Sequence, residues 1–187
     1  MPLARLADRL SAAVGRLCAG LVLTMTAAGA AAAVLRYLAR PLGLDPSLNA
    51  LADAQWMLFS AVFLLGAGWA LSTDAHVRVD VLYGRLGDRA RAWTDLLGTV
   101  LLLLPFCGLL LWATTPAVVG AVAIREGALD PGGLARWPVR LLVPVGVVLL
   151  AVQGLAQALK AVAVLRGRPA PGDGASDVAP PASGARA

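Results

Sequence analysis

The chain has 187 residues, of which 59% are hydrophobic and only 14% charged, and its mean hydropathy is +0.76. A soluble domain of this size is nearer half apolar and a quarter charged, so the composition indicates a membrane protein and excludes an ordinary water-soluble one. The net charge of +5 does not indicate nucleic-acid binding, because the basic residues flank apolar stretches and form no patch with interleaved aromatic residues.

Four uncharged stretches are long enough to cross a bilayer, because about 20 helical residues at roughly 1.5 Å each cover a hydrocarbon core of about 30 Å. Their apolar runs are continuous and lack the alternation of barrel strands, so helices are needed to satisfy the backbone in lipid. The sequence therefore predicts an all-α integral membrane protein with four transmembrane helices at residues 17–35, 54–72, 96–115 and 141–159.

The first stretch has two interpretations. Arg5, Arg9 and Arg16 precede an apolar run that ends in small residues, as in a secretory signal peptide. The run is longer than a usual signal core, and three more spans follow it, which favours an uncleaved signal anchor. We therefore expect a cytoplasmic segment over residues 1–16, followed by a four-helix membrane domain over residues 17–165.

The third stretch contains Pro105 and Pro116. A proline inside a helix removes one hydrogen bond and bends the helix, so we expect a kink near Pro105. The span proper is expected to end near Thr115, with an irregular or helical extension towards Ile124. Beyond Gly167 the chain is rich in Gly, Pro, Ala and Ser, which predicts a disordered cytoplasmic tail over residues 166–187.

The distribution of Lys and Arg predicts the orientation, because cytoplasmic flanks carry an excess of both. Close to the membrane, the two termini and the loop between the second and third spans carry ten basic residues: Arg5, Arg9, Arg16, Arg78, Arg85, Arg89, Arg91, Lys160, Arg166 and Arg168. The other two loops carry five: Arg36, Arg40, Arg125, Arg136 and Arg140. Both ends of the chain are therefore expected in the cytoplasm.

The loop between the second and third spans crowds polar groups just outside the membrane. Asp80 is placed to cap a short helix through Leu86, with Leu82 on the same face as Leu86. This pattern predicts a short amphipathic cytoplasmic helix between the two spans. A solvated loop with orienting arginines and a docking surface for a partner subunit both fit these residues, and the composition does not separate them.

The interiors of the four predicted spans contain no Asp, Glu, His, Lys or Arg. A transport core usually keeps such a residue in the bilayer, and an intramembrane enzyme needs a nucleophile with its base or a metal cluster. Cys18 and Cys107 are expected to be buried and to pack as small hydrophobic residues. His76 is the one histidine of the sequence, so this chain alone cannot supply both ligands of a bis-histidine haem. We therefore predict no catalytic, cofactor-binding or metal-binding residues.

Gln153 and Gln157 are the polar residues of the fourth predicted span, and they stand four residues apart on one helix face. Polar side chains in lipid are expected to face protein, where an interhelical hydrogen bond contributes about 0.6–2 kcal/mol. A structural bond to a neighbouring helix is the simpler role, and a substrate contact is the alternative.

Several short motifs occur in a fixed order along the chain. They are Leu-Arg-Tyr at residues 35–37 followed by Pro-Leu at 41–42, Phe-Leu-Leu-Gly-Ala at 63–67, His-Val-Arg-Val-Asp at 76–80, and Pro-Val-Gly at 144–146 with Gln153 beyond. Their order and spacing within four spans, over about residues 16–165, resemble the DctQ-like small permease subunit of TRAP (tripartite ATP-independent periplasmic) transporters.

This resemblance implies a scaffold subunit of the bacterial inner membrane, without catalytic activity or a cofactor of its own. Such a subunit pairs with a large permease that carries the substrate and sodium sites, while a periplasmic binding protein delivers an organic acid. We expect Arg36 and Tyr37 to anchor the periplasmic end of the first span. Arg78 and Asp80 are expected to help hold the cytoplasmic loop, and His76 is a further candidate for a partner-interface or structural role.

Two other functions fit a four-helix membrane protein. One is an assembly or stability factor for another membrane complex, without a role in transport. The other is a small transporter that works by itself as a homodimer.

Overall fold

A computed structural model of the chain describes residues 2–39, 41, 48–73 and 87–167, and in these residues all regular structure is helical. Helix α1 spans Pro2–Ala39, α2 spans Asn49–Ser72 and α6 spans Trp137–Leu165. The remaining span consists of α4 (Asp88–Leu97), a π-helical segment η2 (Gly98–Leu103) and α5 (Leu104–Ala123). Four helices are thus long and apolar enough to cross a membrane, which confirms the predicted fold class.

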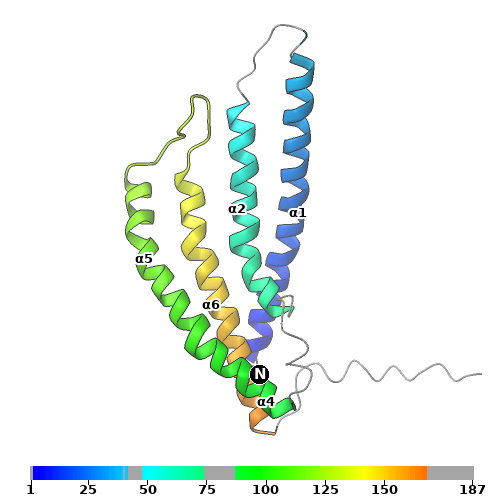
Figure 1. The fold of residues 1–187 in the computed structure, drawn as a ribbon, viewed down its shortest axis with the longest axis vertical. Coiled ribbons are helices and arrows are strands. Elements are labelled where there is room, and N and C mark those ends of the chain that lie inside the picture. Colours follow the sequence, from blue (N-terminus) through cyan, green and yellow to red (C-terminus); the bar gives the residue numbers. More distant parts are fainter. Residues whose placement is uncertain (1, 40, 42–47, 74–86, 168–187) are drawn as a thin grey trace, which may run out of the picture.

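The four spans run alternately up and down, and α6 is the central helix. It packs against α1, α2, α4, η2 and α5, whereas α1 packs against α2 and α6 (Figure 1). The beginning of α1, the end of α2, helix α4 and the end of α6 lie together at what we call the terminal end of the bundle. The connection from α5 to α6, over residues 124–136, lies at the opposite end, which we call the loop end.

The third span departs from an ideal helix before its proline. The amide of Leu104 donates to the carbonyl of Thr99, five residues back, as in a π-helix. Pro105 follows directly; it has no amide hydrogen, and its ring crowds the preceding turn. The irregularity expected near Pro105 therefore occupies the turn before it, and the span curves in Figure 1. Beyond Thr115 the chain remains helical to Ala123.

Small residues allow the helices to approach closely. A Cβ atom placed on Gly146 of α6 would lie 2.6 Å from the carbonyl oxygen of Leu64 on α2. One turn away, a Cβ on Gly68 of α2 would lie 3.4 Å from the carbonyl oxygen of Leu149. The bundle thus buries glycine and alanine while large side chains such as Trp112, which is 77% exposed, point outwards. This distribution is typical of helices packed in lipid, where close backbone contact drives association.

Candidate interhelical polar sites

A buried polar cluster joins the first turns of α1 to the second half of α6. The hydroxyl of Ser11 donates to Oε1 of Gln153 at 2.8 Å, and Nε2 of Gln153 donates to Oδ1 of Asp8 at 3.1 Å. Lys160 forms a salt bridge to the same oxygen of Asp8 at 2.7 Å. The side chain of Gln153 is among the most buried described, with Gln153 only 1% exposed. The cluster therefore satisfies both ends of a buried amide with groups from another helix.

Gln157 makes a second contact between helices at the same end of the bundle. Its Nε2 donates to the carbonyl oxygen of Leu71, near the end of α2, at 3.0 Å. This carbonyl belongs to the last turn of α2, where helical acceptors have no partner within the helix. The two glutamines of α6 thus bond to two different helices, Gln153 to α1 and Gln157 to α2.

At the loop end, Asp53 ties α2 to the connection between α5 and α6. Its Oδ1 accepts a hydrogen bond from Nε1 of Trp56 at 2.9 Å, and its Oδ2 accepts one from the amide of Leu134 at 2.8 Å. The guanidinium of Arg136 lies over the Trp56 ring, 5.4 Å from its centroid, with its Nε buried and without a hydrogen bond to the described residues. A Cβ on Gly133 would collide with the Asp53 carboxylate, so the connection approaches α2 closely here.

Two further contacts fix the same connection. Asn49 donates from Nδ2 to the carbonyl oxygen of Pro131 at 3.0 Å. Glu126 and Arg140 form a bidentate ion pair. One guanidinium NH2 of Arg140 lies 2.8 Å from Oε1 of Glu126, and Nε of Arg140 contacts Oε2. The connection from α5 to α6 is thus attached to α2 at one side and to the start of α6 at the other.

The residues predicted from motifs lie apart from these clusters. Arg36 and Tyr37 stand near the end of α1, both exposed, with Tyr37 80% exposed. His76, Arg78 and Asp80, together with the predicted short cytoplasmic helix, lie outside the described residues. Among the described residues, no three of His, Cys, Asp and Glu are grouped so that they could hold a metal ion.

Four of the clustered residues were missed by sequence reasoning. Asp8, Ser11 and Lys160 lie in the flanks outside the predicted spans. Asp53 precedes the predicted second span but lies within α2, because this helix already begins at Asn49. For α1 a signal was present: Ala7, Ser11, Gly15 and Cys18 recur at helical spacing, and all four are buried. Such a stripe of small and polar residues marks a packed helix face.

Removing the charge of Asp53 is expected to loosen the loop end. In Asp53→Asn an NH2 group replaces one carboxylate oxygen, and this group donates hydrogen bonds but does not accept them. The side chain can then no longer accept one hydrogen bond at each end, from Trp56 and from the amide of Leu134. Hydrogen exchange of residues 125–136 should become several-fold faster, while exchange in the centre of α6 stays unchanged. The matched control is Asp130→Asn on the exposed part of the same connection. Equal exchange in Asp53→Asn and in the unmodified chain would contradict this role of Asp53.

The α1–α6 cluster also predicts that α1 remains in the membrane-inserted protein. Cleavage near residues 27–33 would remove Ser11 and Asp8 and leave the amide of Gln153 buried without these partners. Mass spectrometry of the purified membrane protein should recover peptides that contain residues 6–16 in the same amount as peptides from α6. Their loss from the mature protein would show that α1 acts as a cleaved signal.

Comparison with known proteins identifies the family. The sequence model described as "Tripartite ATP-independent periplasmic transporters, DctQ component" matches residues 25–164, about three quarters of the chain. No curated protein and no solved structure matched the chain. The matched region contains all four spans at least in part, together with Asp53, Gln153 and Gln157. The chain therefore belongs to the DctQ family and is the small membrane component of a TRAP transporter.

Proposed function

We propose that this chain is a static scaffold subunit of a sodium-coupled importer of an organic acid, paired with a large permease that holds the substrate and sodium sites. The observation that supports this most is the use of the buried polar side chains. Gln153, Gln157 and Asp53 each bond to a different neighbouring element, so their polar atoms stabilise the bundle. Side chains committed in this way favour a rigid support over a moving transport site.

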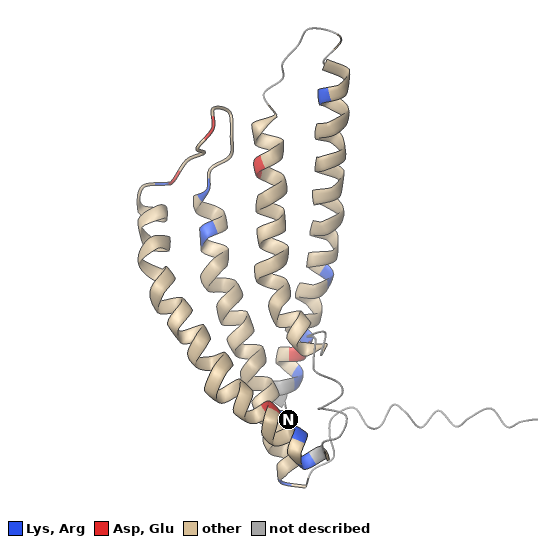
Figure 2. Ribbon diagram, viewed as in Figure 1, with Lys and Arg blue, Asp and Glu red and all other residues tan. Residues whose placement is uncertain are grey.

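The placement of charge supports the same function. In Figure 2 most of the described Lys, Arg, Asp and Glu residues lie towards the two ends of the bundle; the central stretches of α2, α5 and α6 carry none, and α1 carries one basic position further along its length. The outer surface of the middle is formed by large apolar side chains such as Leu23, Phe63 and Leu102. This surface suits lipid and the helices of a large partner, since both are apolar at that depth.

We infer that both ends of the chain face the cytoplasm and that the membrane is the bacterial inner membrane. The terminal end of the bundle gathers the more basic flanks, as the positive-inside rule requires. The loop end, with its connection over residues 124–136, then faces the periplasm and the binding protein. Asp130→Cys should react with a membrane-impermeant maleimide in intact cells, whereas Arg166→Cys should react only after the cells are opened. The reverse pattern would overturn the orientation.

Isolation of the complex tests the pairing. The full chain, tagged at its C-terminus and solubilised gently, should co-purify with a stoichiometric large permease. Cells without the chain should lose sodium-dependent uptake of the acid delivered by the binding protein, and restoring the chain should restore uptake. Recovery of the chain alone, or with respiratory or assembly proteins, would contradict the scaffold function and leave only the helical fold.

The cytoplasmic motif provides a finer test of the same proposal. Arg78→Ala and Asp80→Ala should reduce the amount of permease that co-purifies and reduce uptake in proportion. The affinity of the binding protein for its acid should remain the same, because these residues belong to subunit association. A changed substrate preference in either variant would contradict this role.

A further inference from the structure

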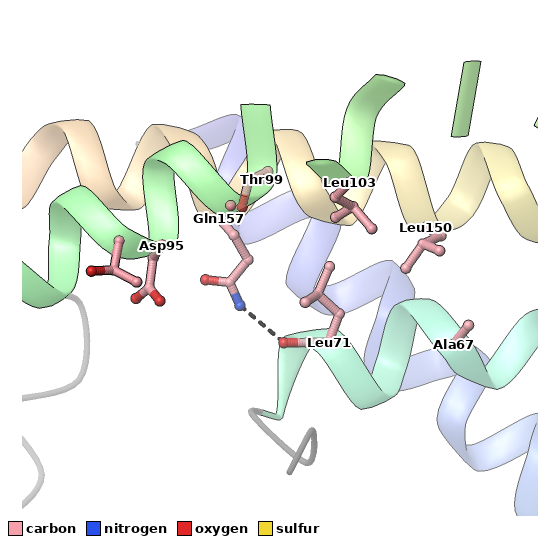
Figure 3. Close-up of a pocket in the computed structure, with 9 residues that line it drawn as sticks. Ala67, Leu71, Asp95, Thr99, Leu103, Leu150 and Gln157 are labelled. Atoms are coloured by element: carbon pink, nitrogen blue, oxygen red, sulfur yellow. Dashed lines mark hydrogen bonds between the residues drawn. The ribbon is translucent and has the colours of Figure 1, made fainter. Parts of the chain in front are cut away.

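A cavity of about 300 Å³ opens at the terminal end of the bundle, between α2, α6 and the span that contains η2. Leu71 lines it from α2, Gln157 and Leu150 from α6, and Asp95 and Leu103 from α4 and η2 (Figure 3). Its volume is at the lower end of the range of small-ligand pockets, about 300–1,000 Å³. The cavity is separate from the α1–α6 cluster around Gln153.

The span that contains η2 lies close to α6 at one side of the cavity and leaves open space at the other. On one side of the cavity, Leu103 of η2 packs tightly on α6, since a Cβ on Gly154 would lie only 2.7 Å from its Cδ2. Within the cavity, a Cβ on Gly98, the first residue of η2, would meet no atom within 4 Å. Leu103, which touches Gly154 of α6, and Gly98, beside which there is open space, thus lie within two turns of each other on the third span. π-Helical segments of this kind are often found at functional sites.

The two ends of the cavity differ in chemistry. In Figure 3 the side chains of Leu103, Leu150 and Ala67 lie at one end. At the other end, Nε2 of Gln157 donates to the carbonyl of Leu71, which leaves its amide oxygen turned towards the side of Asp95. An amide oxygen and a carboxylate are both hydrogen-bond acceptors, and the carboxylate is negative. The polar end therefore suits a positively charged donor, and the other end suits an alkyl chain.

The polar end lies at the level where the helices leave the membrane. Leu71 is the residue before Ser72, at which α2 ends, and Asp95 lies two turns into α4. Arg89 and Arg91 of α4 stand at the same end of the bundle. In a bilayer spanned by the four helices, this end of the cavity would lie at the depth of the lipid headgroups, and the leucine-lined end would lie in the apolar layer.

We propose that this cavity binds one phospholipid with a primary ammonium headgroup, of the phosphatidylethanolamine class. The ammonium donates to the Gln157 oxygen and meets the charge of Asp95, and part of an acyl chain lies against Leu103 and Leu150. The bound lipid fills the space between α2 and η2 and links the end of α2 to the third span. This role is independent of the substrate of the transporter.

The test uses the full chain, together with any subunit that remains bound, and three lipids with identical acyl chains. Phosphatidylethanolamine, phosphatidylcholine and phosphatidylglycerol are added in turn, and binding is measured by native mass spectrometry. We expect phosphatidylethanolamine to bind about tenfold more tightly than the other two, because a hydrogen bond to a charged group contributes about that factor in affinity. Phosphatidylcholine is the closest comparison, because its quaternary ammonium cannot donate a hydrogen bond.

Gly98→Leu and Gly108→Leu form a matched pair of variants. A Cβ has open space at both positions, but only Gly98 lines the cavity. Gly98→Leu should fill the cavity and lower phosphatidylethanolamine binding about tenfold without loss of helix content, since leucine is the better helix former. Gly108→Leu should bind the lipid as the unmodified chain does. Gln157→Leu should remove the preference for the ammonium headgroup.

Three results would overturn the proposal. The first is equal binding of the three lipids by the unmodified chain, which would leave only non-selective acyl contact. The second is full binding of phosphatidylethanolamine by Gly98→Leu. The third is the absence of phosphatidylethanolamine binding by the unmodified chain, which would show that the cavity is not a lipid site.

Discussion

Gly146→Leu is expected to separate α2 from α6 and to lower the melting temperature of the purified chain by about 10 °C. The Cβ of any larger residue at this position would lie 2.6 Å from the carbonyl oxygen of Leu64 and 2.9 Å from its carbonyl carbon. Both atoms belong to the backbone of α2, so a side-chain rotation cannot relieve the clash. Overpacking of a well-packed core costs about 1–3 kcal/mol, and this site should lie at the upper limit.

The control for Gly146→Leu is Gly120→Leu, the same exchange in another spanning helix. Gly120 is exposed on α5, and a Cβ there would meet no atom within 4 Å. This variant should melt within about 2 °C of the unmodified chain, because exposed substitutions change stability little. Thermal unfolding in detergent, followed by size-exclusion chromatography, measures both. Equal melting temperatures for the two variants would show that α2 and α6 do not approach closely at Gly146.

Gln153→Leu is expected to lower the free energy of unfolding by about 1–3 kcal/mol. The variant loses two interhelical hydrogen bonds, and the groups that formed them then face an apolar side chain. The exchange keeps the volume of the side chain but leaves the hydroxyl of Ser11 and one interaction of Asp8 unsatisfied. The melting temperature should fall by about 6 °C. The beginning of α1 should also become accessible to protease, because this segment depends on the cluster for its attachment to α6.

A double variant separates the hydrogen bond from general packing. Adding Ser11→Ala to Gln153→Leu removes the unsatisfied hydroxyl, so the double variant should be more stable than the sum of the two single changes predicts. Gln55→Leu is the same exchange at a residue of α2 that is exposed, although its side chain lies against Gly29 of α1. It should lower stability less than Gln153→Leu, because Gln153 is only 1% exposed. Strict additivity of Ser11→Ala and Gln153→Leu would contradict a direct bond between the two residues.

The sequence alone determined the class of the protein and the number of its spans. Lipid satisfies no backbone hydrogen bond, so an uncharged stretch of about 20 residues has essentially one structure available to it, and hydropathy is enough to find it. The ordered motifs at residues 35–42, 63–67, 76–80 and 144–146 also resembled the family that the comparison then showed. The expectation that Gln153 and Gln157 face protein followed from the same physics, because an amide exposed to lipid is costly.

The tertiary structure decided which residues meet. Asp8, Ser11 and Lys160 look like ordinary flanking residues in the sequence, and only the pairing of α1 with α6 brings them to Gln153. One of the two hydrogen-bond partners of Asp53 is a backbone amide 81 residues away, which no local pattern encodes. The cavity beside Gly98 likewise depends on a π-helical segment and on two other helices. Hydropathy is a property of each segment by itself, whereas contacts depend on how the segments pack, and for that reason the sequence predicted the spans but not the clusters that join them.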